Sequence, residues 1–249
     1  DIKRIPYIVP NIIRGTTVKD VQNNISLAKD DWDSFETSWN FIKHPLIRPI
    51  SSVSEAFSQW ENECENRFNQ LKESEEELNR IFIDIYGLGN ELTPDVEDKD
   101  VTLKTNIAYR YKQKKKNKKS DNNEYELEEE IIEPMEVRKK RFLHDTICEL
   151  ISYAVGCMFG RYSLDVDGLA YAGGQWDDSK YITFVPDADN CIPITDEEYF
   201  EDDIVGLFCG WLKKVYGEDT LEENLDFIAK ALGNKGSTSR EIIRNYFLN

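Results

Sequence analysis

The sequence has little of what simple catalytic motifs require. Its two histidines, His44 and His144, lie far apart, and it contains no HExxH, GxSxG, Walker loop or dinucleotide-binding fingerprint. No set of residues has the spacing of metal ligands, and no carboxylate lies in an apolar context that would raise its pKa for acid–base work. We therefore predict no catalytic, cofactor-binding or metal-ligating residue in this chain.

Long apolar runs and paired cysteines are also missing. The most apolar segment is interrupted by Cys148, Glu149 and Arg161, and falls short of the about 20 residues that a membrane helix needs. The five cysteines form no CxxC pair, so we interpret them as reduced thiols. We expect a cytoplasmic protein without membrane contact, and the start at Asp1 favours a piece of a longer chain.

Positive charge is scarce, with 31 Lys and Arg against 48 Asp and Glu and a net charge of −17. Residues 142–232 carry 5 basic against 19 acidic side chains, whereas residues 233–249 carry 3 against 1. Phosphate binding needs cationic side chains that release counterions. If DNA is a partner, it must therefore approach a chain end or the basic run at residues 110–119.

Helical periodicity dominates most of the sequence and predicts a mainly α fold. We expect a helical bundle-like fragment with a long strut helix and a short irregular or β segment. We expect four consecutive segments. The first two are an extended, aromatic-rich lead-in at 1–50, with a short helix ending before Pro45, and a long helix with an acidic turn at 51–103. The last two are a charged flexible insert at 104–141 and a helical domain at 142–249, whose irregular part, 162–195, holds one or two short strands.

Capping residues predict where several helices begin and end. Ser52 and Glu55 precede an apolar stripe that extends to about residue 86, where Gly87 stops it. Three closing helices are expected to be capped by the pairs Thr195 and Glu198, Thr220 and Glu223, and Thr238 and Glu241.

Three small residues, Ser152, Gly156 and Gly160, recur four apart in the central apolar segment and predict a groove along one helix. The groove either admits a close helix crossing or leaves room for a ligand. Because no cofactor motif accompanies it and acidic residues surround it, we favour a packing seam. We expect the seam to lock the segment GRYSLDVDGLAYAGG, residues 160–174, against the helix of 53–86 or of 199–216.

One local site is compatible with binding an anion. The sequence GNKGSTSRE, residues 233–241, places unpaired backbone N–H groups at a helix N-terminus, where the helix dipole favours negative charge. An ordinary glycine stop followed by a capped helix start explains the same residues equally well. We predict a DNA-phosphate contact at Lys235, Gly236, Ser237, Thr238 and Arg240.

Several long strings resemble a known family. SWNFIKHPL, ISYAVGCMFGRYSLDVDGLAYAGG and ITDEEYFEDDIVGLFCGWLKKVYG are similar to the middle portion of the PglX-type adenine-specific DNA methyltransferases of BREX phage-defence systems. A Ser-Trp-x-Phe motif and a Gly-Arg-(Phe/Tyr) helix end more weakly resemble type IIG restriction-methylation enzymes.

The resemblance implies a full-length enzyme that methylates N6 of adenine in double-stranded DNA with S-adenosylmethionine. The chain has no Pro-Pro catalytic loop, so the resemblance places this segment after the catalytic core, as a helical spacer or support leading to target recognition. Other defence-system proteins are possible partners. The alternative, from a different class, is a non-enzymatic acidic module that binds protein partners.

Overall fold

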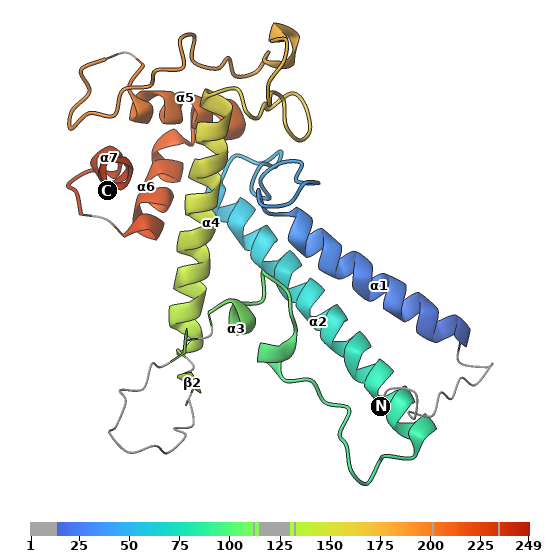
Figure 1. Cartoon of the computed structure of the whole chain (residues 1–249). Coiled ribbons are helices and arrows are strands. Elements are labelled where there is room, and N and C mark those ends of the chain that lie inside the picture. Colours follow the sequence, from blue (N-terminus) through green and yellow to red (C-terminus); the bar gives the residue numbers. More distant parts are fainter. Residues whose placement is uncertain (1–13, 112, 115–129, 132, 201, 234) are drawn as a thin grey trace, which may run out of the picture. The chain divides into compact units, whose positions relative to one another are not determined.

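The computed structural model describes residues 14–111, 113–114, 130–131, 133–200, 202–233 and 235–249. Its architecture is mainly α, which confirms the predicted class (Figure 1). The helices are α1 (Arg14–Asp33), α2 (Val53–Tyr86), α3 (Ile107–Arg110), α4 (Met135–Met158), α5 (Ile204–Tyr216), α6 (Leu221–Leu232) and α7 (Ser239–Leu248). Strands β1 (Gln113–Lys114) and β2 (Glu130–Ile131) form a two-residue antiparallel pair, with Gln113 opposite Ile131.

The chain forms two compact units that interleave along the sequence. The first combines residues up to Trp32 with Asn62–Arg138, and the second combines Asp33–Glu61 with Lys139–Asn249. Helix α2 therefore contributes its beginning to the second unit and the rest to the first. The division of the chain into four consecutive segments stays a prediction.

The first unit has a small core and one buried carboxylate. Leu71, Val101 and Leu103 are buried, with Leu27, Phe68 and Val96 packed against them. Asp31, at the end of α1, accepts hydrogen bonds from the backbone N–H groups of Lys104 (2.6 Å) and Thr105 (3.2 Å). Arg67 from α2 lies 3.7 Å from the same carboxylate.

The extended lead-in is wrong for residues 14–33, which form α1; residues 1–13 lie outside the described part of the chain. Leu27 and Asp31 lie one helical turn apart, and both face the core of the first unit. The helix is polar along most of its length, so its apolar period is too weak to read from the sequence. Contacts with distant residues, Thr105 among them, supply the missing stabilisation.

The predicted helix between residue 31 and Pro45 is also wrong. After α1 the chain turns, because Asp33 accepts a hydrogen bond of 2.5 Å from the Ser38 hydroxyl instead of capping a new helix. Of the aromatic residues there, Phe35 and Phe41 are buried, but Trp39 is fully exposed at 101%. The segment is a compact turn with one solvent-facing indole.

Helix α2 confirms the long helix at its predicted bounds. The Ser52 hydroxyl accepts a hydrogen bond from the backbone N–H of Glu55 (3.3 Å), and Gly87 follows the helix with a φ of +68°. The backbone N–H of Val53 donates to the Asn224 side chain from α6 (2.8 Å). This contact fixes the start of α2 within the second unit.

The core of the second unit surrounds α4, which buries Phe142, Ile147, Leu150, Tyr153 and Met158. Trp211 of α5, Tyr153 of α4 and Phe208 of α5 are the largest side chains that are almost wholly buried. Helix α6 packs against both α5 and α7. The largest other members of the core are Leu46, Ile147, Leu150, Ile151, Met158, Leu212, Leu225 and Ile228.

The predictions for the closing helices need two corrections. Helices α6 and α7 begin after Thr220 and Thr238 as predicted, and α6 ends at Gly233, but the Thr220 side chain makes no capping hydrogen bond, so that predicted cap is wrong. The cap at Thr195 and Glu198 is wrong, because α5 begins at Ile204 after Asp203, whose carboxylate accepts from the Val205 N–H at 3.0 Å. The predicted pattern lies in a loop that Asp203 ends.

The segment 162–195 is irregular as predicted, but the described residues there contain turns and the short 3-10 helix η3 (Asp178–Lys180) instead of strands. Side chains hold this loop together in place of a strand ladder. The Asp165 carboxylate accepts from the backbone N–H groups of Ile182 and Thr183, each at 2.8 Å. This carboxylate therefore joins parts of the loop that lie 17 and 18 residues apart in the sequence.

The small-residue groove is not a helix–helix seam. Helix α4 ends at Met158, and Gly160 follows it in the left-handed region with a φ of +72°. The ring of Tyr162 lies on Gly156, where a Cβ atom would come within 2.6 Å of the Tyr162 Cδ2. The space that glycine leaves is filled by the loop that follows the same helix.

Candidate functional site

The predicted anion site lies between α6 and α7, beside a cavity of about 560 Å³ that we call the α6–α7 cavity. Of the predicted residues, Ser237, Thr238 and Arg240 line it; the other lining residues are Glu222, Asp226, Ala229, Lys230, Gly233, Ser239 and Ile242. Lys235 and Gly236 do not line it. The structure therefore brings three of the five predicted residues together, and adds two carboxylates that sequence spacing did not reveal.

The N-terminus of α7 is capped by side chains of the chain itself. The Thr238 hydroxyl accepts from the Glu241 N–H at 3.2 Å, and the Glu241 carboxylate accepts from the Ser237 N–H at 2.7 Å. Gly236 is needed for packing, because a Cβ there would lie 2.8 Å from the Ile242 Cγ1. The Ser237 N–H, one of the donors predicted to hold a phosphate, already serves this capping box.

Both carboxylates of the α6–α7 cavity have close partners. Arg240 donates two hydrogen bonds to Glu222, at 2.9 and 2.6 Å, and the Ser239 hydroxyl donates to Asp226. The hydrogen bonds from Arg240 lower the pKa of Glu222, and those to Glu222 raise the pKa of Arg240. A phosphate would have to compete with Glu222 for this guanidinium.

A buried ion pair joins α7 to the start of α5, and the sequence did not point to it. Arg244 donates to both oxygens of Asp203, at 2.7 and 2.8 Å, and Asp203 has no exposed surface. Burial alone would raise the pKa of Asp203, but the hydrogen bonds from Arg244 and the Val205 N–H lower it below its usual range. The pair fixes the helix that carries one wall of the α6–α7 cavity.

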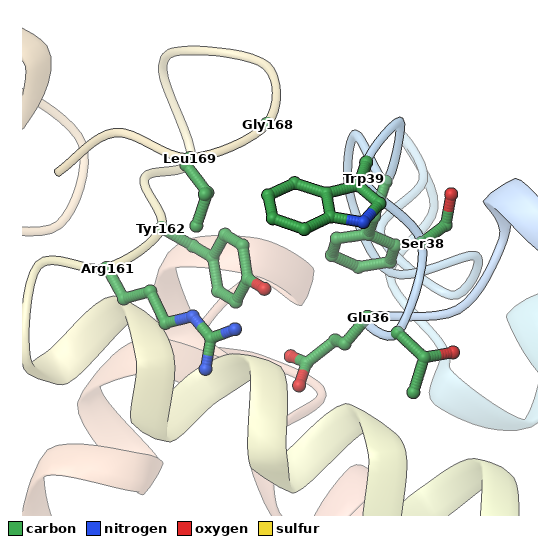
Figure 2. Close-up of a pocket in the computed structure, with 9 residues that line it drawn as sticks. Glu36, Ser38, Trp39, Arg161, Tyr162, Gly168 and Leu169 are labelled. Carbon is green, nitrogen blue, oxygen red and sulfur yellow. The ribbon is translucent and has the colours of Figure 1, made fainter. Parts of the chain in front are cut away.

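A second cavity, of about 330 Å³, lies between the turn after α1 and the loop after α4 (Figure 2). We call it the Trp39 cavity, after the exposed indole at its edge. Figure 2 shows Trp39 and Tyr162 facing the same space, with Glu36 and Arg161 at its base. Its lining residues are Glu36, Thr37, Ser38, Trp39, Phe41, Arg161, Tyr162, Gly168 and Leu169.

Glu36 is the unusual group of the Trp39 cavity. Its Oε2 accepts a hydrogen bond of 3.0 Å from the Ser152 hydroxyl, while its Oε1 is buried without a hydrogen-bond partner among the described residues. Burial raises the pKa of Glu36, although Ser152 and Arg161 act in the opposite direction. This corrects the expectation that no carboxylate of the chain lies in such an environment.

Two short motifs that are far apart in the sequence meet at this cavity. Ser38, Trp39 and Phe41 belong to the Ser-Trp-x-Phe motif, and Arg161 and Tyr162 belong to the Gly-Arg-(Phe/Tyr) helix end. The backbone N–H of Gly168 donates to the carbonyl of Ile42 at 2.8 Å and ties the two loops together. The two motifs were visible in the sequence, but nothing in the sequence showed that they lie close together in the fold.

The histidine and cysteine side chains that could have served as catalytic groups are packing residues or free thiols. His44 is buried, and burial lowers its pKa to about 3, as a neutral packing residue would show. Burial raises the pKa of Cys64 to about 12, and all five cysteines are free. Within the described ranges, no group of three or more His, Cys, Asp or Glu side chains is arranged to hold a metal ion.

Comparisons with known proteins agree with the resemblance seen in the sequence. The chain is 44% identical to the adenine-specific methyltransferase PglX of Lacticaseibacillus casei (strain Zhang) over 230 residues, covering 89% of the chain. It is 35% identical to the adenine-specific methyltransferase BrxX of Escherichia coli O9:H4 (strain HS) over 259 residues, covering 99% of the chain. No protein-family model matches the chain.

The chain spans 16% of the length of the first of these relatives and 20% of the second. Among the described helices, none combines the length and apolar character needed to cross a membrane. The prediction of a PglX-type relationship is confirmed: the chain corresponds to a segment of the PglX-type family of adenine-specific methyltransferases.

Proposed function

We propose that this chain is a helical support segment of a DNA adenine N6-methyltransferase, located between the catalytic and target-recognition parts. The observation that carries the proposal is the similarity to two adenine-specific methyltransferases along 89% and 99% of the chain. The chain also lacks a Pro-Pro catalytic loop and a glycine-rich cofactor strand. The methyl donor, S-adenosylmethionine, is therefore bound elsewhere in the full-length enzyme.

The similarity favours this function over a non-enzymatic acidic module that binds protein partners. In this proposal the full-length enzyme acts on double-stranded DNA in the cytoplasm, as part of phage defence. The second unit has a packed aromatic core, which suits a rigid support between the catalytic and target-recognition parts. Contacts with other defence-system proteins belong to the same proposal.

The DNA-phosphate contact at Lys235, Gly236, Ser237, Thr238 and Arg240 stays a proposal. Lys235 is exposed and contributes positive charge, but Arg240 would have to leave Glu222 to bind phosphate. We therefore expect any contribution of this loop to DNA binding to be modest and sensitive to salt.

Calorimetric titration with S-adenosylmethionine tests whether the cofactor binds outside this segment. The 249-residue chain and the intact enzyme are titrated under the same conditions. We expect saturable binding to the intact enzyme and none to the chain. Binding of comparable affinity to the 249-residue chain would place the cofactor site here and contradict the proposed support role.

A further inference from the structure

Two recognition groups of the Trp39 cavity are unsatisfied within the chain. The indole of Trp39 is 101% exposed, so neither of its faces is covered. The Oε1 of Glu36 is buried and has no hydrogen-bond partner in the described ranges. A buried acceptor without a donor is costly, and a fully exposed tryptophan leaves a large apolar surface in water. A ligand that stacks on the ring would cover the indole, and a hydrogen-bond donor on it would face the Glu36 carboxylate, which lines the cavity.

The charges of the cavity restrict the ligand. Glu36 contributes one negative charge and Arg161 one positive charge, and the other lining residues are neutral. Arg161 lies with its guanidinium carbon 5.2 Å from the centre of the Tyr162 ring and remains exposed. A cationic lysine or arginine from a partner would meet this guanidinium, and an anion would meet Glu36. A neutral group with both a donor and an acceptor fits best.

The shape also favours a flat ring. Trp39 and Leu169, whose side chain is 54% exposed, present apolar surfaces to the cavity. The cavity volume of about 330 Å³ lies at the lower end of the range for small-molecule sites, about 300–1,000 Å³. Nucleobases are flat, neutral, and carry N–H donors beside ring or carbonyl acceptors. Base stacking on exposed aromatic side chains is a general mode of single-strand recognition.

We propose that the Trp39 cavity binds a single unpaired nucleobase, stacked on Trp39, with an N–H of the base donating to Glu36 and an acceptor of the base facing Arg161. The base comes from a nucleic-acid strand or from a free nucleotide, since both present the same ring. This role goes beyond structural support, and it does not depend on where methyl transfer takes place.

The loops around the cavity are held in place before any ligand binds. The ring of Tyr162 lies on Gly156, and the backbone N–H of Tyr162 donates to the Gly156 carbonyl at 3.1 Å. On the other side, the Ser38 hydroxyl accepts from the Asn40 N–H at 3.1 Å and shapes the turn that presents Trp39. A preorganised site loses less free energy on binding than a flexible one.

The test measures, by fluorescence anisotropy, the binding of labelled hexanucleotides to the intact enzyme. One probe is single-stranded oligothymidylate, and the other has the same backbone with abasic sites. The variants are Trp39→Ala, Trp39→Phe and Glu36→Gln. Tyr199→Ala is the control, because Tyr199 is an exposed aromatic residue of the same unit, at 62%, outside the cavity. Unlabelled nucleoside monophosphates are added as competitors.

We expect Trp39→Ala to weaken binding of the base-bearing probe about tenfold, in line with the loss of one base–aromatic stack. The abasic probe should bind all variants alike, Trp39→Phe should retain most of the affinity, and Tyr199→Ala should match the wild type. Competition by monophosphates would identify free nucleotides as a source of the base, and its absence would identify the strand. Unfolding midpoints of the Trp39 variants should match the wild type, since the side chain is exposed.

Three results would overturn the proposal. The first is an unchanged affinity of Trp39→Ala for the base-bearing probe. The second is an equal loss for the abasic probe, which would indicate a backbone contact. The third is Trp39-dependent binding of an arginine-containing peptide without binding of either probe, which would assign the cavity to a protein partner.

Discussion

Two surface cavities of the second unit, the α6–α7 cavity and the Trp39 cavity, use their charged groups in opposite ways. In the α6–α7 cavity, Glu222 and Asp226 both accept hydrogen bonds from neighbouring side chains. In the Trp39 cavity, one oxygen of Glu36 is buried without a described partner, beside a fully exposed indole. The comparison teaches that a locally basic sequence need not leave its charged groups free, because acidic side chains of the same chain can pair with them.

The cavities also differ in their sequence signals. Residues 233–241 are basic in an acidic chain, whereas no local pattern singles out Glu36. In the structure Arg240 pairs with Glu222, whereas Lys235 stays exposed.

Breaking the buried pair behind the α6–α7 cavity should have the largest effect. Arg244→Met leaves Asp203 buried without its charge partner, and we expect a loss of about 3–5 kcal/mol in the free energy of unfolding. Denaturant titration of the 249-residue chain measures this loss. Arg240→Met, which removes an exposed pair, is the matched control and should cost at most about 1 kcal/mol. Equal losses for both variants would show that burial of the Asp203 pair is unimportant.

The same pair predicts a dependence on pH. Because the folded-state pKa of Asp203 is lowered, its stabilising contribution is complete above the unfolded-state value, about 3.9, and declines as the pH falls through the folded-state value. The difference between wild type and Arg244→Met should therefore narrow as the pH falls towards and below about 4. Unfolding free energies at a series of pH values test this, and a gap that widens in acid would contradict it.

A smaller loss is expected at the Trp39 cavity. Gly156→Ala places a Cβ within 2.6 Å of the Tyr162 ring, so the ring and its loop must move. We expect a loss of about 1–3 kcal/mol from overpacking, measured by denaturant titration. Gly210→Ala in α5 is the control, since nothing lies within 4 Å of its Cβ position. It should stabilise the helix by about 0.5–1 kcal/mol; a Gly156→Ala variant that behaves like it would refute the role assigned to Gly156.

The smallest effect is expected at the predicted phosphate loop. The double variant Lys235→Ala and Arg240→Ala should change duplex-DNA affinity of the intact enzyme by only a few fold. If both residues contact phosphates, the slope of log affinity against log salt should fall by about one for each residue. Affinity measured at several salt concentrations decides this, and an unchanged slope would remove the loop from the DNA interface.

Sequence patterns predicted the elements whose signals are local. Helix α2 has a capping serine, a long apolar stripe and a terminal glycine, and α6 and α7 have similarly complete signals. Helix α1 was missed because its stabilising contacts, such as that of Asp31 with Thr105, join residues far apart in the chain. The start of α5 was misplaced because Thr195 and Glu198 imitate a capping box within a loop.

The Trp39 cavity could be predicted only in part for the same reason. The two motifs were visible, but their meeting depends on long-range contacts such as that of Gly168 with Ile42. The raised pKa of Glu36 depends on burial by residues from both loops and has no signature in its own sequence neighbourhood. Similarity to adenine-specific methyltransferases, in contrast, is carried by long strings of residues and needs no three-dimensional information.

The most direct test of the support role is the rate of adenine methylation in duplex DNA by the intact enzyme carrying Gly156→Ala, with Gly210→Ala as control. The affinity for S-adenosylmethionine is measured on the same samples. We predict a lower methylation rate for Gly156→Ala at unchanged cofactor affinity, and wild-type behaviour for Gly210→Ala. A wild-type rate in a Gly156→Ala enzyme whose segment is measurably destabilised would contradict the claim that this segment supports methyl transfer.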